Sequence, residues 1–261
     1  MKIFVEQVTI NKILNSHPMN TSQTVQKMKS LHLTGMVQAY DTCLAAKDYQ
    51  TYSPDELLTL LIDAEWQERE NKRITRLTEN ASFRQRAYVS NIKFTAEHLA
   101  DKDLIMRLAT GNFIQAWENI LITGPTGVGK SFIASALGHQ ACSLGYKTIY
   151  YHTAKLFQKL YGARADNTLY KELLKIEKHD LLILDDFGLQ NLEKQHRDLL
   201  MEIIEDRHNG RSTIIASQLP VNQWYNIIGE GNIADAILDR LVHTAHRITL
   251  TGESMRKKAK A

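Results

Sequence analysis

The pattern of apolar and polar positions changes character near the middle of the chain. Over residues 21–86 the apolar side chains recur at the three- and four-residue spacing of helices, and Ser53 with Pro54 is typical of a helix start. From residue 119 onward short strand-like apolar runs alternate with helical segments, and these runs are 119–123, 147–152, 181–184, 213–216 and 247–250. Strands that alternate with helices predict an α/β fold with a parallel, helix-covered sheet, here preceded by an all-helical domain.

A glycine-rich segment follows the first of these strands and reads Gly-Pro-Thr-Gly-Val-Gly-Lys-Ser over residues 124–131. It matches the G-x-x-x-x-G-K-[ST] phosphate-binding loop and lies between a strand and a helix, as such a loop requires. Glycines let several backbone N–H groups converge on phosphate oxygens, and the helix dipole favours the same anion. We expect Lys130 to contact the β- and γ-phosphates and Ser131 to ligate Mg²⁺. The sequence therefore predicts that a nucleoside triphosphate binds to Gly124, Pro125, Thr126, Gly127, Val128, Gly129, Lys130, Ser131 and Phe132.

Acidic and polar side chains stand at the carboxyl ends of two later strands. Asp185 and Asp186 come directly after the third strand-like run, and ligands of parallel sheets bind at this edge. We expect Asp185 to hold Mg²⁺ together with Ser131, and Asp186 to orient or deprotonate the attacking water. Ser217 and Gln218 follow the next strand and are candidates for sensing the γ-phosphate. Together with the loop, these residues predict a site of nucleotide hydrolysis.

The distribution of charge points to a partner more clearly than the net charge does. The chain of 261 residues carries 32 Lys and Arg against 29 Asp and Glu, a balance that names no partner. Between residues 66 and 93, however, seven basic residues stand against three acidic ones, which is typical of a nucleic-acid surface. The candidate DNA-binding residues in this segment are Arg69, Lys72, Arg73, Arg76, Arg84 and Arg86.

Two further features favour a cytoplasmic location. Cys43 and Cys142 stand far apart in the sequence and form no CxxC pair, which is typical of reduced thiols. No apolar stretch approaches the roughly 18 residues that span a membrane, and charge interrupts the start of the chain too early for a signal peptide.

Several motifs together resemble one family, the IstB helper ATPases of bacterial insertion sequences. The motifs are the loop at 124–131, Asp-Asp-Phe-Gly-Leu at 185–189, Ser-Gln-Leu-Pro at 217–220, Ala-Ile-Leu-Asp-Arg-Leu-Val-His at 236–243 and Gly-Glu-Ser-Met-Arg at 252–256, with further matches at 31–36 and 65–71. This family lies in the AAA+ class of P-loop NTPases, near the helicase loader DnaC and the initiator DnaA. The resemblance covers roughly residues 19–258.

The resemblance implies ATP and Mg²⁺ as cofactors, and double-stranded DNA and a cognate transposase as partners. It also implies an ATP-dependent homo-oligomer in which Arg240 is the arginine finger that reaches a neighbouring subunit's nucleotide. Most AAA+ proteins have Glu where Asp186 stands, although this branch commonly has Asp, so the resemblance implies slow hydrolysis. Arg256 occupies a sensor-2-like position. The catalytic positions carried over are Lys130, Asp186, Ser217, Gln218, Arg240 and Arg256.

The sequence and the resemblance together predict four segments. Residues 1–18 form an extension, with Met19 as an alternative start, and residues 19–90 form a helical DNA- or partner-binding domain. Residues 91–116 form a linker that leads into the core, and residues 117–261 form the AAA+ ATPase core with a short basic tail.

Other functions remain as alternatives. A helicase loader of the DnaC type has nearly the same core motifs, but it usually carries an Asp-Glu pair and a Ser-Asn pair at the positions of Asp185-Asp186 and Ser217-Gln218. A small-molecule kinase needs arginines in a lid, and only Arg164 lies between the two nucleotide motifs. A GTPase is disfavoured because no Asn-Lys-x-Asp tetrad occurs. A non-catalytic adaptor that uses ATP only structurally would be distinguished by its lack of turnover.

Overall fold

The computed structural model describes residues 21–46, 51–94, 101–229 and 231–255. The chain divides into two compact units, Met1–Arg73 and Ile74–Ala261. The expected extension at residues 1–18 and the candidate site residue Arg256 lie outside the described residues. No helix in the described ranges is long and apolar enough to cross a membrane.

The first unit is helical, as the sequence predicts. It consists of α2 (Thr21–Ser30), α3 (Thr34–Ala46) and the greater part of α4 (Pro54–Ala81). The backbone N–H of Ser53 donates to the Glu56 carboxylate at 2.8 Å, and the N–H of Glu56 donates to the Ser53 hydroxyl at 3.3 Å. This reciprocal pair is a capping box, and it confirms the helix start predicted at Ser53 and Pro54.

Glu65 of α4 joins the two longer helices of this unit. Its buried carboxylate accepts the backbone N–H of Gly35 at 2.8 Å and that of Met36 at 3.3 Å, at the beginning of α3. A Cβ at position 35 would collide with the Ala64 backbone, so glycine allows the helices to approach. Burial raises the pKa of Glu65, but Arg69 at 2.6 Å and the two N–H groups outweigh it and lower the pKa. The carboxylate therefore stays ionised and keeps the start of α3 capped.

The second unit is built on a parallel sheet with strand order β2-β3-β4-β1-β5. Its strands are β1 (Ile120–Thr123), β2 (Thr148–His152), β3 (Leu181–Phe187), β4 (Ser212–Ser217) and β5 (His246–Thr249). Because β4 lies between β3 and β1, Ser217 at its carboxyl end is paired with both Thr123 and Phe187. The ends of these three strands therefore meet at one edge of the sheet. The predicted α/β fold with a parallel sheet is confirmed.

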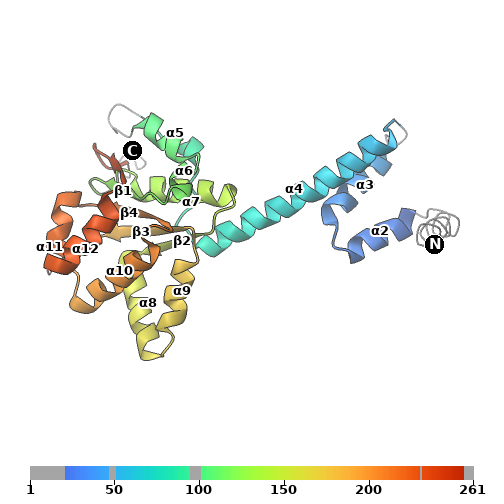
Figure 1. The fold of residues 1–261 in the computed structure, drawn as a ribbon. Coiled ribbons are helices and arrows are strands. Elements are labelled where there is room, and N and C mark those ends of the chain that lie inside the picture. The colour runs from blue at the N-terminus through green and yellow to red at the C-terminus, as the bar shows by residue number, and fades with distance from the viewer. Residues whose placement is uncertain (1–20, 47–50, 95–100, 230, 256–261) are drawn as a thin grey trace, which may run out of the picture. The chain divides into compact units, whose positions relative to one another are not determined.

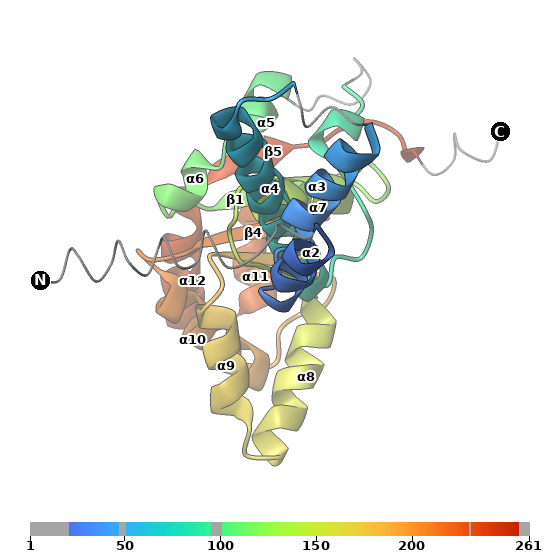
Figure 2. The ribbon, with the colours of Figure 1, turned by 90° about the vertical axis from the view of Figure 1, so that its right-hand side faces the viewer.

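Helices cover both faces of this sheet, as Figures 1 and 2 show. One face packs against η2 (Val89–Asn91), α5 (Lys102–Leu108), α6 (Asn112–Gln115) and α7 (Lys130–Ser143). The other packs against α8 (Thr153–Ala165), α9 (Leu169–Glu177), α10 (Lys194–Arg207), η3 (Val221–Gln223), α11 (Trp224–Ile228) and α12 (Gly231–Val242). In β1, Ile120 and Ile122 join the first apolar cluster and Leu121 joins the second. Burial on both faces explains the continuous apolar runs 120–122 in β1 and 181–184 in β3.

The segment that precedes the sheet packs into the second unit. Ala81 and Ala87 are fully buried, and Ile105 of α5 and Phe113 of α6 belong to the apolar cluster under α7. The border between the compact units lies inside α4, at residues 73 and 74, whereas the sequence predicts a functional boundary near residue 90. The division into a DNA- or partner-binding domain and an ATPase core stays a prediction.

Candidate nucleotide-binding site

The glycine-rich loop connects β1 to α7, as the motif requires. Its three glycines, Gly124, Gly127 and Gly129, have φ angles of 147°, 86° and 106°, in the region that a side chain disfavours. At Gly127 a Cβ would also collide with the Ser254 side chain, and at Gly124 it would collide with the Leu250 carbonyl oxygen. Glycine is therefore required here both for the backbone conformation and for space.

Lys130 and Ser131 are the first two residues of α7, where the helix dipole attracts an anion. The Lys130 side chain is only 6% exposed, and its Nζ donates to the Pro125 carbonyl oxygen at 2.6 Å. The Ser131 hydroxyl donates to Asp185 Oδ1 at 2.9 Å. The loop thus keeps an ammonium group next to the helix start and links its serine to the acidic strand end.

Asp185 is fully buried and accepts three hydrogen bonds on its carboxylate. Oδ1 accepts from Ser131 and from the backbone N–H of Asp186 at 2.9 Å, and Oδ2 accepts from the Tyr150 hydroxyl at 2.5 Å. The Thr153 hydroxyl donates to the Asp185 carbonyl at 2.9 Å and holds the same backbone. Burial, and then the hydrogen bond to Asp185, raises the pKa of Tyr150 above its ordinary value. The phenol therefore remains a donor, and it orients the carboxylate toward Ser131.

Asp186 stands at a strained position beside this group. Its φ of 56° is unusual for a residue with a side chain, and such strain concentrates at functional sites. One carboxylate oxygen lies 3.3 Å from His152 Nε2 and 3.5 Å from an Arg84 guanidinium nitrogen. His152 ends β2, whereas Arg84 follows α4. We expected Arg84 to contribute to a DNA surface, and the structure places it beside the nucleotide loop.

The two residues at the end of β4 have different surroundings. Ser217 is fully buried, and its hydroxyl donates to the Phe187 carbonyl at 2.8 Å and accepts the Leu219 N–H at 3.1 Å. Gln218 accepts a hydrogen bond from the Thr126 hydroxyl at 2.7 Å. Gln218 is therefore in contact with the phosphate-binding loop, whereas the Ser217 hydroxyl ties the end of β4 to the end of β3.

Two adjoining cavities lie along the loop. The first has a volume of about 350 Å³ and is lined by loop and acidic residues together with Arg84 and Gln218. The second, of about 210 Å³, is largely apolar. It is lined by Ile92, Val128, Ile133, Leu250 and others, and it shares Gly129, Phe132 and Met255 with the first cavity. A charged cavity beside an apolar one matches the phosphates and the base of a nucleotide.

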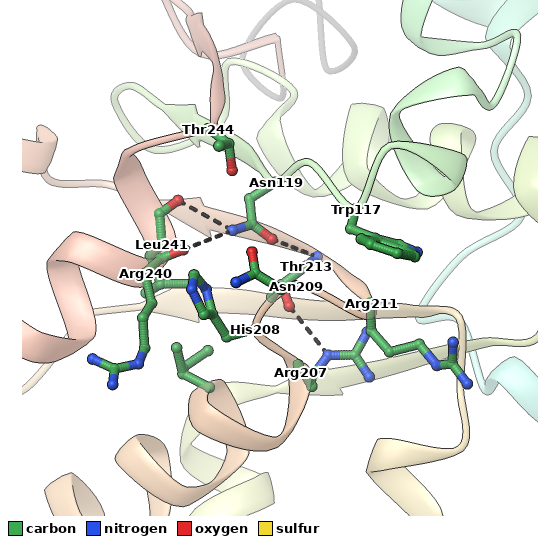
Figure 3. Close-up of a pocket in the computed structure, with 11 residues that line it drawn as sticks. Trp117, Asn119, Arg207, His208, Asn209, Arg211, Thr213, Arg240, Leu241 and Thr244 are labelled. Atoms are coloured by element: carbon green, nitrogen blue, oxygen red, sulfur yellow. Dashed lines mark hydrogen bonds between the residues drawn. The ribbon is translucent and has the colours of Figure 1, made fainter.

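Arg240 lies close to Asn119, at the amino-terminal end of β1 (Figure 3). One guanidinium nitrogen donates to the Ala236 carbonyl at 2.9 Å, and another is 2.7 Å from the Glu205 carboxylate. The Arg240 carbonyl accepts from Asn119, the residue directly before β1, at 3.2 Å. Because Asn119 precedes the strand and the phosphate loop follows it, Arg240 and the loop of the same subunit lie at opposite ends of β1.

Most of the candidate DNA-binding residues lie on α4 and are exposed. Three of them pair with glutamates of the same helix, namely Arg69 with Glu65, Lys72 with Glu68 and Arg73 with Glu70, at 2.6, 3.0 and 3.1 Å. Arg76 and Arg86 are exposed. The pairs of Lys72 and Arg73 are with partly exposed glutamates and are weak, so they leave these cations able to contact phosphate, whereas Arg69 is bound to the buried Glu65.

Sequence reasoning missed several residues that line this site. Tyr150 and His152 carry no motif of their own, and Arg84 was assigned by its charge alone. The two tyrosines in the middle of an otherwise buried strand were the one available signal, because a buried phenol needs a hydrogen-bond partner.

Comparison with known proteins gives matches along most of the chain. Residues 26–261 match a family model described as IstB-like ATP binding protein. The "Putative insertion sequence ATP-binding protein y4pL" of Sinorhizobium fredii is 43% identical over 235 residues, which cover 90% of this chain and 96% of that protein. Among solved structures, "Crystal Structure of the DnaI" has a TM-score of 0.57 at 20% identity and covers 68% of this chain and 94% of the other. "Crystal structure of the DnaC helicase loader" has a TM-score of 0.53 at 19% identity and covers 63% and 97%.

Proposed function

The chain belongs to the family of IstB-like ATP-binding proteins, and from this premise we propose that it is the ATP-dependent DNA-binding helper of a transposase. In this proposal the protein binds ATP and Mg²⁺ and assembles as a homo-oligomer on duplex DNA. The assembly presents that DNA to a cognate transposase, and slow hydrolysis of ATP releases it. The family match, together with relatives named as insertion-sequence ATP-binding proteins, supports this role over other ATPase functions.

The observation that carries the nucleotide part of the proposal is the contact between Ser131 and Asp185. A hydroxyl at the start of the loop helix lies 2.9 Å from a fully buried carboxylate at a strand end. Mg²⁺ is commonly bound by one or two protein oxygens together with substrate phosphates and water. Ser131 and Asp185 supply two such oxygens side by side, so they fit a Mg²⁺ that arrives with ATP. The ion would neutralise charge on the β- and γ-phosphates.

Three further residues, Lys130, Asp186 and Gln218, would have separate roles in ATP binding and hydrolysis. Lys130 is placed to exchange the neutral Pro125 carbonyl for phosphate oxygens, which are stronger acceptors for an ammonium group. Asp186 lines the same cavity and would orient or deprotonate the water. Gln218 would report the γ-phosphate through its contact with Thr126.

Arg240 completes the proposed site from a second copy of the chain. Its place at the amino-terminal end of β1, whereas the loop follows the carboxyl end of that strand, supports a role across a subunit interface. An arginine that reaches a neighbour's γ-phosphate makes hydrolysis depend on assembly. The same dependence would couple release from DNA to the state of the oligomer.

A helicase loader remains the alternative. The likeness to DnaI and DnaC, at 20% and 19% identity, is a likeness of fold alone. The family match covers residues 26–261 and favours the transposition role, and it also disfavours a small-molecule kinase.

The DNA part of the proposal is tested by binding to duplex DNA across a salt series, with ATP, with ADP and without nucleotide. Replacing Lys72, Arg73 and Arg76 with Ala should weaken binding to all sequences and make the salt dependence shallower, because phosphate contacts release counterions. The matched control removes three exposed lysines, Lys171 and Lys175 of α9 and Lys178 directly after it. Equal effects of the two triple variants, or binding that ATP does not strengthen, would refute the proposed surface and assembly.

A further inference from the structure

Arg84 shares a cavity with the phosphate-binding residues although it is distant from them in sequence. The cavity of about 350 Å³ is lined by Arg84, Lys130, Ser131 and Asp186 among others. No motif assigns Arg84 to a nucleotide site, because it lies 40 residues before the loop in a segment that leads from α4 to the core.

The backbone around Arg84 is held firmly on both sides. Ala81 and Ala87 are fully buried, and the Phe83 ring lies 4.2 Å from the His139 ring, centroid to centroid. A Cβ at Gly138 would come within 2.6 Å of the Phe83 ring, so α7 carries glycine where this ring packs. Arg84 is thus delivered to the cavity by an anchored segment rather than by a free loop.

The Arg84 side chain, in contrast, is free to change partners. It is 54% exposed, and its nearest guanidinium nitrogen lies 3.5 Å from Asp186, longer than the usual 2.7–2.9 Å of a charge-assisted hydrogen bond. Asp186 has a second partner in His152 at 3.3 Å, so the carboxylate does not depend on Arg84 alone. A weak, exposed pair of this kind is readily replaced by a stronger acceptor.

We propose that Arg84 senses the terminal phosphate of the nucleotide: it pairs with Asp186 in the nucleotide-free protein and binds the γ-phosphate when ATP is present. This inference rests on the proposed ATPase function of the site. Guanidinium groups form forked, charge-assisted hydrogen bonds to phosphate, so ATP displaces the Asp186 pair. The exchange leaves Asp186 in contact with His152 and available to a water molecule.

The exchange has a second consequence because of where Arg84 lies in the chain. It is the third residue after Ala81, at which α4 ends. Binding and loss of the γ-phosphate therefore alter a side-chain contact immediately beyond that helix, whose earlier part belongs to the first unit. The residue that discriminates ATP from ADP therefore lies in the segment that directly follows the candidate DNA-binding helix α4.

The test compares the affinities of full-length variants for ADP and for a non-hydrolysable ATP analogue, both with Mg²⁺. Arg84→Gln should weaken binding of the ATP analogue about tenfold, equivalent to about 1.4 kcal/mol, while ADP affinity changes by less than about twofold. Arg84→Lys should give an intermediate ratio because a lysine keeps the charge but lacks the fork. Arg107→Gln is the matched control, since it removes an exposed arginine of α5 that does not line the cavity.

A double-mutant cycle with Asp186→Asn separates sensing from a structural effect. Asp186→Asn should raise the affinity for the ATP analogue more when Arg84 is present than in the Arg84→Gln background. The reason is that only Arg84 must give up its pair with Asp186 to bind the γ-phosphate. Thermal unfolding should show that the Arg84 variants fold normally.

Arg84→Gln could weaken the binding of both nucleotides equally, or it could leave the ratio of the two affinities unchanged, as in Arg107→Gln. Either result would refute the role of Arg84 as a sensor without contradicting the proposed nucleotide-binding function. If the wild-type protein bound neither nucleotide, both the proposed function and this inference would fail.

Discussion

Replacing Tyr150 with Phe removes one hydroxyl from the buried centre of the site and leaves the ring in place. In the intact protein this hydroxyl donates to Asp185 Oδ2 at 2.5 Å, while Ser131 and the Asp186 N–H both bond to Oδ1. The variant therefore leaves Oδ2 without its donor on a residue that is fully buried. The ring still packs in the apolar cluster, so the loss of packing is small.

The size of the effect follows from the charge and burial of the acceptor. A hydrogen bond to a charged group contributes about 1.5–3 kcal/mol, and an unpaired buried acceptor keeps its cost of desolvation. We therefore expect Tyr150→Phe to lower the free energy of unfolding of the second unit by about 2 kcal/mol, which corresponds to roughly 4–8 °C in Tm for a unit of this size. Affinity for Mg²⁺-ATP should also fall, because the carboxylate loses the donor that orients it toward Ser131.

Urea unfolding and Mg²⁺-dependent nucleotide binding measure the two effects. Tyr151→Phe is the matched control, because this neighbouring half-buried phenol lies on the other face of the sheet, where its ring is 5.7 Å from Lys159. We expect the control to cost less than about 1 kcal/mol and to leave nucleotide affinity unchanged. Equal destabilisation by the two variants, or full Mg²⁺-ATP affinity in Tyr150→Phe, would refute the role assigned to this hydrogen bond.

The same hydrogen bond makes a prediction about pH. Burial and the Asp185 carboxylate raise the pKa of Tyr150 above 10, the ordinary value at which the unfolded chain loses this proton. Above pH 10 the unfolded state therefore binds fewer protons than the folded state, and stability falls as pH rises. The contribution of the hydroxyl is fully present below pH 10 and is lost above it. The stability difference between wild type and Tyr150→Phe should accordingly shrink in alkaline solution above pH 10.

Three further changes test other parts of the site. Asp186→Asn should leave ATP binding intact while the rate of hydrolysis in single-turnover assays falls by about 10²-fold or more. Parallel losses of binding and hydrolysis would instead show that Asp186 is structural. Mixing Lys130→Ala with Arg240→Ala subunits should restore part of the ATPase activity, since hybrid interfaces join an intact loop to an intact arginine finger. If assembly is normal and no mixing ratio restores activity, Arg240 acts within its own subunit. Gly127→Ala should abolish tight nucleotide binding and destabilise the unit by roughly 1–3 kcal/mol, because its φ is 86° and its Cβ would strike Ser254; near-normal affinity would contradict the loop conformation.

The phosphate loop could be predicted from sequence because its chemistry is local. The glycines, Lys130 and Ser131 are consecutive in the chain, and a strand before them with a helix after them suffices to orient their N–H groups. The apolar runs likewise predicted the parallel sheet, since a strand that is buried on both faces leaves a continuous apolar segment. Asp185 could be placed near the loop by one general rule, that ligands meet the carboxyl ends of parallel strands.

The partners of Asp186 were decided by tertiary structure alone. Arg84 and His152 reach Asp186 from segments 102 and 34 residues away, and no periodicity relates these positions. Arg84 has the same charge as its neighbour Arg86, so composition assigned both residues to one surface. Only the packing of the intervening segment decides which arginine enters the cavity.

The orientation of Ser217, a candidate for sensing the γ-phosphate, could not be predicted from the sequence either. Its place at the end of β4 follows from sequence, but a hydroxyl can turn toward a ligand or toward the backbone. The neighbouring strand end supplies the Phe187 carbonyl at 2.8 Å, and a buried hydroxyl takes the partner that packing provides. Local sequence therefore determined the loop, the strands and the order of their polar ends, because these depend on backbone conformation and burial over a few residues. Long-range packing decided which side chains meet Asp186 and which way Ser217 turns, because those contacts depend on how distant segments fit together.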